Sequence, residues 1–193
     1  MSRRYPSVVE RYFQKYYHKK NDRCEDICIL AHSNNICLVT LAPTHVALSE
    51  GSIKSVSYEF GNQTIDKVVS GKKKHGAFKV NPKRPICQIT TELGNTYTIT
   101  TGISGKLIEV NKNLLTDPGL VSRKPESLGY LAVILHKYVG PGGKICQDLQ
   151  EHSEYIKSLG SCPEVQSDIS EESTTKQSIE GVIHTDLSHT WNI

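Results

Sequence analysis

Apolar positions along most of the chain recur in short runs of strand length, each bounded by Gly, Pro, Asn or Asp. Two such runs, 27–32 and 36–41, flank Ser33-Asn34-Asn35 and predict a β-hairpin. The alternation over 52–60 predicts a third strand. From 68 to 135 the pattern is again of short strands broken by Gly and Pro, with a helix expected only around 113–120. Regular short strands of this kind predict a barrel or a sandwich.

The middle of the chain carries the segment ISGKLIEVNKNLL, residues 103–115. Its apolar and polar residues alternate, which predicts a half-buried strand. Ser104-Gly105 forms a bend that a residue without Cβ adopts easily, and it is expected to start this strand. The polar residues that follow from Asn111 are expected to end it.

Two segments show helical periodicity instead. Residues 7–20 carry an i, i+4 apolar stripe after Ser7, a plausible N-cap, and residues 145–160 end on Gly160. The first helix could pack on a sheet or present an aromatic and basic docking face. Beyond Gly160 the chain is polar, rich in Ser, Thr and Glu, and nearly aperiodic, which predicts a disordered tail. The expected organisation is therefore a helix in 1–23, a β domain with a C-terminal helix in 24–160, and a tail in 161–193.

Composition narrows the class of protein. The chain has 37% hydrophobic residues, enough for a core, but its longest apolar runs are far shorter than the roughly 20 residues of a spanning helix. The N-terminus has basic residues with no apolar block after them, so we expect the cytosol or nucleus rather than a membrane or secreted location. The six cysteines are then expected to be reduced, and their spacing does not predict a metal site.

Charge is distributed unevenly. The net charge of +3 divides into +7 for residues 1–110, with 16 basic and 9 acidic residues, and −4 for residues 111–193, with 7 and 11. One segment concentrates the positive charge, and we call it the basic strip: Lys72, Lys73, Lys74, Lys79, Lys83 and Arg84. It could bind an acidic protein surface, a phosphate backbone or the nuclear import machinery, or it could be a solvated face. Phe78 is the one Phe, Tyr or Trp residue within it, so stacking on nucleic-acid bases is not favoured.

Catalytic motifs are not recognisable. The histidines lack the spacing of a metalloprotease, and no nucleophile elbow or paired-carboxylate motif is present. GPGGK, residues 140–144, lacks the spacing and the Ser or Thr of a phosphate-binding loop. We expect a protein that is not an enzyme.

Residues 97–135 resemble the second half of a lipoyl- or biotinyl-type domain, above all the H protein of the glycine cleavage system. The matching features are Ser104-Gly105, Asn111 with Leu114, Asp117-Pro118 and Gly129-Tyr130-Leu131. The resemblance implies a barrel-sandwich hybrid, mainly β, with flanking α-helices. In that family the prosthetic group is carried by a lysine at a hairpin tip about ten residues before the Ser-Gly bend. Gly94 stands there, and no lysine lies between Pro85 and Gly105, so we expect neither lipoate nor biotin nor any other cofactor.

A resemblance over more of the chain rests on several separate blocks: residues 24–45, 53–58 and 69–77, GKLIEVN from Gly105 and KPESLGYLAVIL from Lys124. They are similar to the actin-binding transcription modulator family, also called Simiate or Abitram. This resemblance implies a regulator of actin filament dynamics that also acts in the nucleus, with nuclear speckles and actin-rich cell projections as its locations. It leaves open the actin-contact residues, the preference for monomeric or filamentous actin and the oligomeric state.

Two alternatives remain from the residues themselves. The first is a nuclear factor that binds nucleic acid through the basic strip. The second is a carrier-fold protein without a prosthetic group that docks on enzymes.

Overall fold

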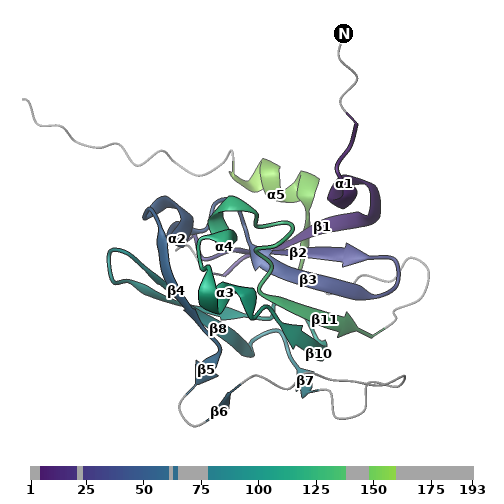
Figure 1. Cartoon of the computed structure of the whole chain (residues 1–193). Helices are drawn as coiled ribbons and strands as arrows, with labels where there is room; N and C mark the ends of the chain where they lie inside the picture. The colour runs from purple at the N-terminus through teal and green to yellow at the C-terminus, as the bar shows by residue number, and fades with distance from the viewer. Residues whose placement is uncertain (1–4, 21–23, 61–62, 65–77, 138–147, 160–193) are drawn as a thin grey trace, which may run out of the picture. The chain divides into compact units, whose positions relative to one another are not determined.

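Strand order in the computed structural model places the N-terminal and C-terminal segments at one edge of a large antiparallel sheet (Figure 1). The structure describes residues 5–20, 24–60, 63–64, 78–137 and 148–159, which all belong to one compact unit spanning residues 1–161. In spatial order the seven strands are β12 (Gln150–Glu151), β1 (Phe13–His18), β2 (Ile27–His32), β3 (Ile36–Leu41), β11 (Ala132–His136), β10 (Gly105–Val110) and β7 (Phe78–Val80). The predicted hairpin over 27–41 is confirmed as β2 and β3.

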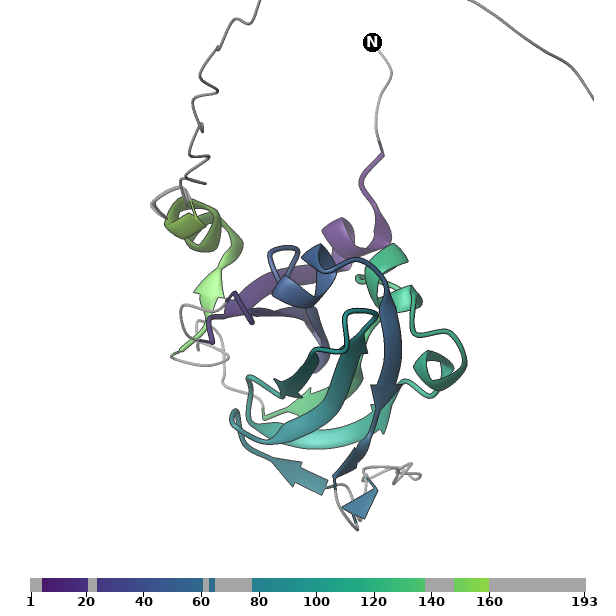
Figure 2. The same ribbon diagram turned by 90° about the vertical axis from the view of Figure 1, so that its left-hand side faces the viewer.

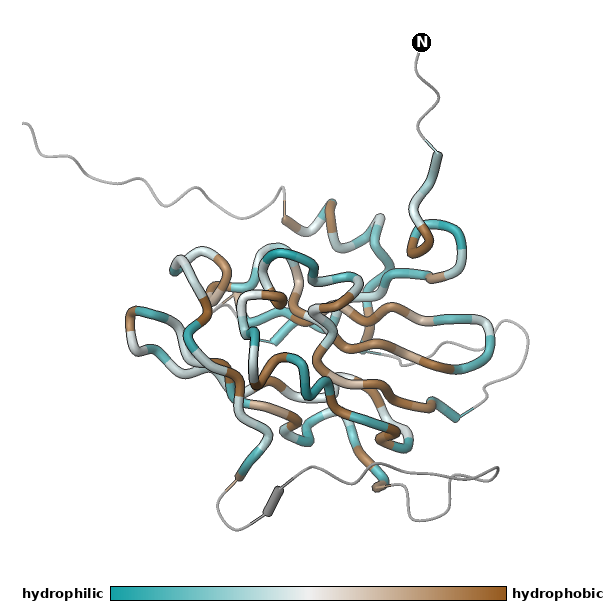
Figure 3. Tube along the Cα trace, viewed as in Figure 1, coloured by the Kyte–Doolittle hydropathy of each residue, from teal (hydrophilic) through white to brown (hydrophobic). Residues whose placement is uncertain are grey.

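A second sheet faces the first across the core (Figure 2). It consists of β4 (Ile53–Ser57), β8 (Pro85–Thr91) and β9 (Thr96–Thr100), and a short pair, β5 (Glu59–Phe60) and β6 (Gln63–Thr64), extends beyond it. Residues from both sheets, such as Ile29, Val39, Ile89 and Ile134, are fully buried in one cluster. Hydrophobic segments, brown in Figure 3, recur along the strands of these sheets. The predicted mainly β fold is confirmed.

The helices of the described residues are short and lie at the ends of strands. They are α1 (Val8–Tyr12), α2 (Val46–Ser49), α3 (Asn113–Thr116), α4 (Leu120–Arg123) and α5 (His152–Leu159). The helical segment expected around 113–120 is present as two separate turns, α3 and α4. No helix in the described ranges is both long and apolar enough to cross a membrane.

The N-terminal helix predicted over 7–20 is wrong beyond its first turn. Ser7 does cap α1, because its hydroxyl accepts a hydrogen bond from the Glu10 backbone N–H while the Glu10 carboxylate accepts one from Ser7 N–H. From Phe13, however, the chain is a strand that pairs with β2 over six residues. Aromatic residues favour strands as well as helix faces, and the pairing partner, 14 residues along the chain, is invisible to a local pattern.

The C-terminal helix is shorter than predicted. Residues 150–151 form β12 against β1, and α5 starts at His152, whereas 145–147 lie outside the described residues. The helix is fixed to β1 by Tyr155, whose ring stacks on Tyr17 with 4.0 Å between centroids. The Tyr155 hydroxyl also donates a hydrogen bond of 2.9 Å to Asp26. The segment predicted as a disordered tail, 161–193, lies outside the described residues too.

Candidate functional site

The β8–β9 hairpin ends in a turn that contains Gly94, the position that the resemblance to lipoyl- and biotinyl-type domains matches with their lysine. Its turn spans Thr91 to Asn95 and is closed by backbone hydrogen bonds from Gly94 N–H to Thr91 O (3.0 Å) and from Thr91 N–H to Asn95 O (2.9 Å). Gly94 has a φ of +85°, a conformation that glycine adopts without a steric penalty. The tip exposes Leu93, at 70%, but presents no ammonium group that could be acylated.

A carboxylate from elsewhere in the chain holds this tip. Glu50, which follows α2, accepts hydrogen bonds from the Tyr97 hydroxyl (2.6 Å), the Asn95 amide (2.8 Å) and the Thr91 hydroxyl (2.9 Å). The bond from Tyr97 is the largest cause of the lowered pKa of Glu50. Glu50 is not apparent from the sequence, because it lies 41 residues before Thr91 and no local motif marks it. Glu50 fixes the tip to the body of the domain.

The structure describes only half of the basic strip. Lys79 lies in β7 and is exposed, whereas Lys83 and Arg84 lie in the turn between β7 and β8. The Arg84 guanidinium lies 4.1 Å from the centroid of the Phe78 ring, a cation–π contact that holds this side chain against the surface. Lys72, Lys73 and Lys74 lie outside the described residues. The structure therefore places Lys79, Lys83 and Arg84 in one short stretch, and the grouping of all six residues stays a prediction.

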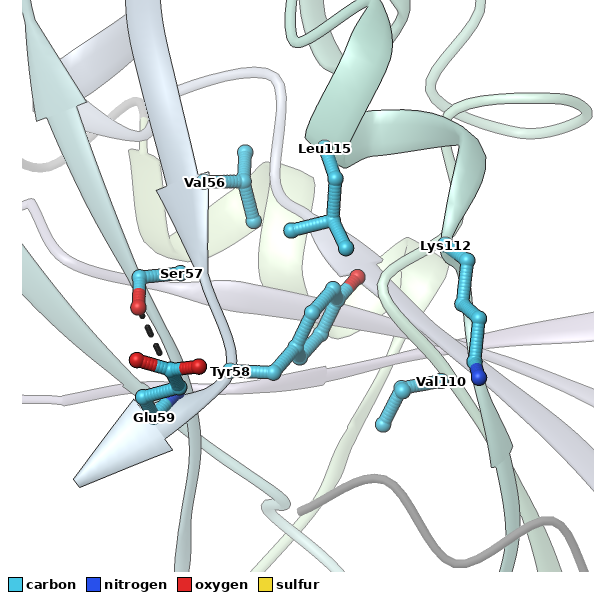
Figure 4. A pocket seen from close by; sticks show the side chains of 7 residues that line it. All are labelled: Val56, Ser57, Tyr58, Glu59, Val110, Lys112 and Leu115. Atoms are coloured by element: carbon cyan, nitrogen blue, oxygen red, sulfur yellow. Dashed lines mark hydrogen bonds between the residues drawn. The ribbon is translucent and has the colours of Figure 1, made fainter. Parts of the chain in front are cut away.

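A pocket of about 320 Å³, lined by apolar residues and by Ser57, Glu59 and Lys112, lies between the end of β4 and the start of α3 (Figure 4). The Tyr58 ring forms its floor, with Leu115 and Val56 above it and Val110 at its side. The Tyr58 hydroxyl is buried and lies 3.1 Å from Asn111 O and 3.0 Å from Leu131 O, both of which are acceptors. Desolvation is the main cause that raises the pKa of Tyr58 above its ordinary value. The Tyr58 phenol is therefore buried, hydrogen-bonded and protonated, and it is not available as a reactive group.

Asn111, at the end of the 103–111 segment, makes hydrogen bonds that hold two loops together. Its side-chain amide, in a residue only 2% exposed, donates to Leu128 O (2.7 Å) and Tyr130 O (2.8 Å), and its Oδ1 accepts from Asn113 N–H (3.2 Å). These three bonds hold the start of α3 against the segment that leads into β11. Asn111 is therefore a structural residue that joins two loops.

The described residues assemble no cluster of three His, Cys, Asp or Glu side chains that could hold a metal ion. Cys28, Cys37 and Cys87 are buried free thiols, and desolvation raises the pKa of both Cys28 and Cys37 to about 12. A thiol with so high a pKa is not a nucleophile at neutral pH. Cys24 is free and exposed, whereas Cys146 and Cys162 lie outside the described residues.

Comparison with solved structures identifies the fold. The H protein of the glycine cleavage system from Mycobacterium marinum superimposes with a TM-score of 0.51, covering 76% of this chain and 97% of that protein, at 15% sequence identity. At so low an identity the likeness concerns the fold alone. It agrees with the barrel-sandwich hybrid expected from residues 97–135.

Comparison with curated proteins identifies relatives, although no family model matches the chain. Protein Abitram from Xenopus tropicalis is 45% identical over 139 residues, which cover 69% of this chain and 76% of the relative. The human protein of the same name is 43% identical over 138 residues, with 69% and 76% covered. The Dictyostelium discoideum protein is still 32% identical over 133 residues, with 66% and 74% covered. At this identity and coverage, the chain belongs to the Abitram family.

Proposed function

We propose that this chain is a non-enzymatic actin-binding protein that regulates filament dynamics in the cytoplasm and also acts in the nucleus. The observation that carries the proposal is the exposed basic stretch in β7 and the following turn. Lys79 and Lys83 are exposed there, and the ion pairs among the described residues involve Lys15, Lys20 and Arg123 instead. Unpaired positive charge of this kind attracts an acidic partner and accelerates its association.

The partner is inferred from the family. The resemblance to the actin-binding transcription modulator family makes actin, which is acidic overall, the first partner to test. The fold supports a binding role rather than a carrier role, because the hairpin tip has Gly94 in place of a lysine and Glu50 fixes it. Relatives named Abitram and an H-protein-like fold are together consistent with a protein without catalytic activity.

Actin binding is tested with a strip variant in which Lys72, Lys73 and Lys74 become Glu. The matched control reverses the exposed lysines Lys54, Lys124 and Lys157, so both variants change the net charge by the same amount. We expect the wild-type chain and the control to pellet with filaments and to alter pyrene-actin assembly. The strip variant should bind about tenfold or more weakly at low salt, and the difference should shrink as the ionic strength rises.

The outcomes separate the candidate functions. Equal binding of both variants would show that Lys72, Lys73 and Lys74 form a solvated face and that actin contacts another surface. Absence of pelleting, together with tight and salt-sensitive RNA binding that only the strip variant loses, would assign the strip to nucleic acid. Intact mass spectrometry of the native protein tests whether the chain is a carrier. A lipoyl or biotinyl mass increment would contradict the expectation that it holds no prosthetic group.

A further inference from the structure

A second pocket, of about 570 Å³, opens where β7 and β11 end beside the start of β10. We call it the basic pocket, because three lysines from three strands or their ends line it: Lys79, Lys106 and Lys137. Val80 and Leu135 provide apolar walls, and Gly105 adds no side chain between them. Its volume lies within the range of about 300–1,000 Å³ typical of small-molecule sites.

The charge of this pocket is not neutralised by the residues that line it. No carboxylate belongs to the lining, and the ion pairs among the described residues involve Lys15, Lys20 and Arg123.

Two of the lysines are direct cross-strand neighbours. Lys79 of β7 pairs in register with Lys106 of β10, so their side chains project on the same face of the sheet. Like charges placed directly opposite each other destabilise a sheet. A lysine on an edge strand protects against unwanted strand pairing, which explains Lys79. Protection of an edge does not explain Lys106, because β10 lies between β7 and β11 and is not an edge strand.

We propose that the basic pocket binds a phosphate group carried by a partly apolar ligand. A dianionic phosphate offsets the repulsion between Lys79 and Lys106, and lysine ammonium groups are common point-charge partners of phosphate. The walls formed by Val80 and Leu135 then accommodate the apolar part of the ligand. The ligand is either a free phosphorylated compound or a phospholipid head group, which share this chemistry.

The probe for the phosphate group is inorganic pyrophosphate, titrated into the ¹⁵N-labelled full-length chain at low salt. We expect the largest amide shifts at Lys79, at Ser104 to Lys106 and at His136 and Lys137. The double variant Lys79→Gln/Lys106→Gln should bind at least about tenfold more weakly, since each lost hydrogen bond between charged groups corresponds to about that factor or more. The matched control, Lys54→Gln/Lys124→Gln, removes two exposed lysines elsewhere and should bind as the wild type does.

A flotation assay distinguishes the two sources of phosphate. Vesicles of phosphatidylcholine alone are compared with vesicles that also contain phosphatidylinositol phosphates. Binding to the second kind only, lost in the double variant, identifies a lipid head group, whereas pyrophosphate binding without vesicle binding identifies a free phosphorylated compound.

The proposal is overturned if the double variant binds pyrophosphate like the wild type, or if shifts spread equally to Lys54, Lys124 and Lys157. The strip variant of the actin test leaves the lysines of the basic pocket intact, so the two proposals can fail separately.

Discussion

The hairpin tip and the basic pocket differ in whether their charged groups have partners within the chain. At the tip, the single carboxylate of Glu50 accepts three hydrogen bonds from Thr91, Asn95 and Tyr97. In the pocket, Lys79 and Lys106 oppose each other without a carboxylate in the lining. The resemblance to lipoyl- and biotinyl-type domains implies a lysine at this tip, whereas this chain has Gly94 there and hydrogen bonds within the domain. The charged groups without a carboxylate beside them lie in the basic pocket, on the seven-stranded sheet.

This difference has a consequence for mutagenesis. Polar residues with internal partners contribute to the free energy of unfolding, so their replacement destabilises the chain. Lysines that repel each other contribute unfavourably until a ligand binds, so their replacement leaves stability unchanged or raises it.

The largest effect is expected from Asn111→Ala. The substitution removes two partly buried hydrogen bonds and leaves the carbonyls of Leu128 and Tyr130 without their donor, at about 1–2 kcal/mol each, so the free energy of unfolding should fall by about 2–4 kcal/mol. The control is Asn113→Ala, the same change at an exposed position two residues later, which should cost less than about 0.5 kcal/mol. Urea denaturation measures both. Equal midpoints for the two variants would mean that Asn111 does not join the loops.

The second effect concerns pH and His45, which is 1% exposed. Desolvation is the main cause that lowers its pKa from 6.5 to about 4, so the folded chain holds His45 neutral while the unfolded chain protonates it near pH 6.5. Glu25, Lys20, Asp26 and Glu50 are the charged groups near it, and the carboxylates only partly offset the desolvation. Stability is therefore full above about pH 6.5 and is lost as the pH falls towards 4, by about 3 kcal/mol in total.

His45→Asn isolates this contribution. The asparagine Oδ1 can replace His45 Nδ1, which accepts the hydrogen bond from Ala47 N–H at the start of α2. Denaturation of wild type and variant between pH 7 and 4.5 should show a shallower loss in the variant. Some loss should remain, because burial also lowers the pKa of His18. Parallel curves would show that His45 is protonated without cost.

Much of the fold could be predicted from local patterns. The hairpin over 27–41, the strand from Gly105 and the tight turn at Gly94 each have a signal within a few residues: alternation, a Ser-Gly bend and a Gly-Asn pair. The N-terminal segment could not be predicted in the same way. Its aromatic residues satisfy a helical stripe and a strand equally, and β2 and β12 decide between them.

The candidate site was predicted less completely than the fold. Clustered lysines are visible in a sequence, so the sequence predicts the basic strip, including Lys79. Lys106 and Lys137 are isolated in the sequence and reach Lys79 only through the register of β7, β10 and β11. Glu50 depends in the same way on a contact between distant segments. A site whose residues meet only through strand pairing has no local signature, whereas a site formed by neighbouring residues in the sequence has one.

The third effect is expected from Gly105→Ala, in the floor of the basic pocket. Gly105 is not one of the described glycines with positive φ, so the bend is not what requires glycine. Instead, a Cβ would lie 2.6 Å from Leu135 O and 2.7 Å from Ile134 Cγ2. Separating β10 from β11 should cost about 1–3 kcal/mol. The control is Gly119→Ala, where a Cβ would meet nothing closer than 3.5 Å, and an equal melting temperature for both would contradict the close approach.

The smallest effect has the opposite sign. Lys106→Gln removes the repulsion with Lys79 while keeping most of the side chain, so without ligand the free energy of unfolding should rise by about 0.2–1 kcal/mol at low salt. The gain should disappear at high salt, because exposed charges are screened. Lys54→Gln, an exposed lysine in β4, should change nothing and serves as the control. Calorimetry of the three proteins at two salt concentrations measures the effect. Destabilisation by Lys106→Gln would mean that this lysine has a favourable partner within the chain, and the contrast between the tip and the basic pocket would then not hold.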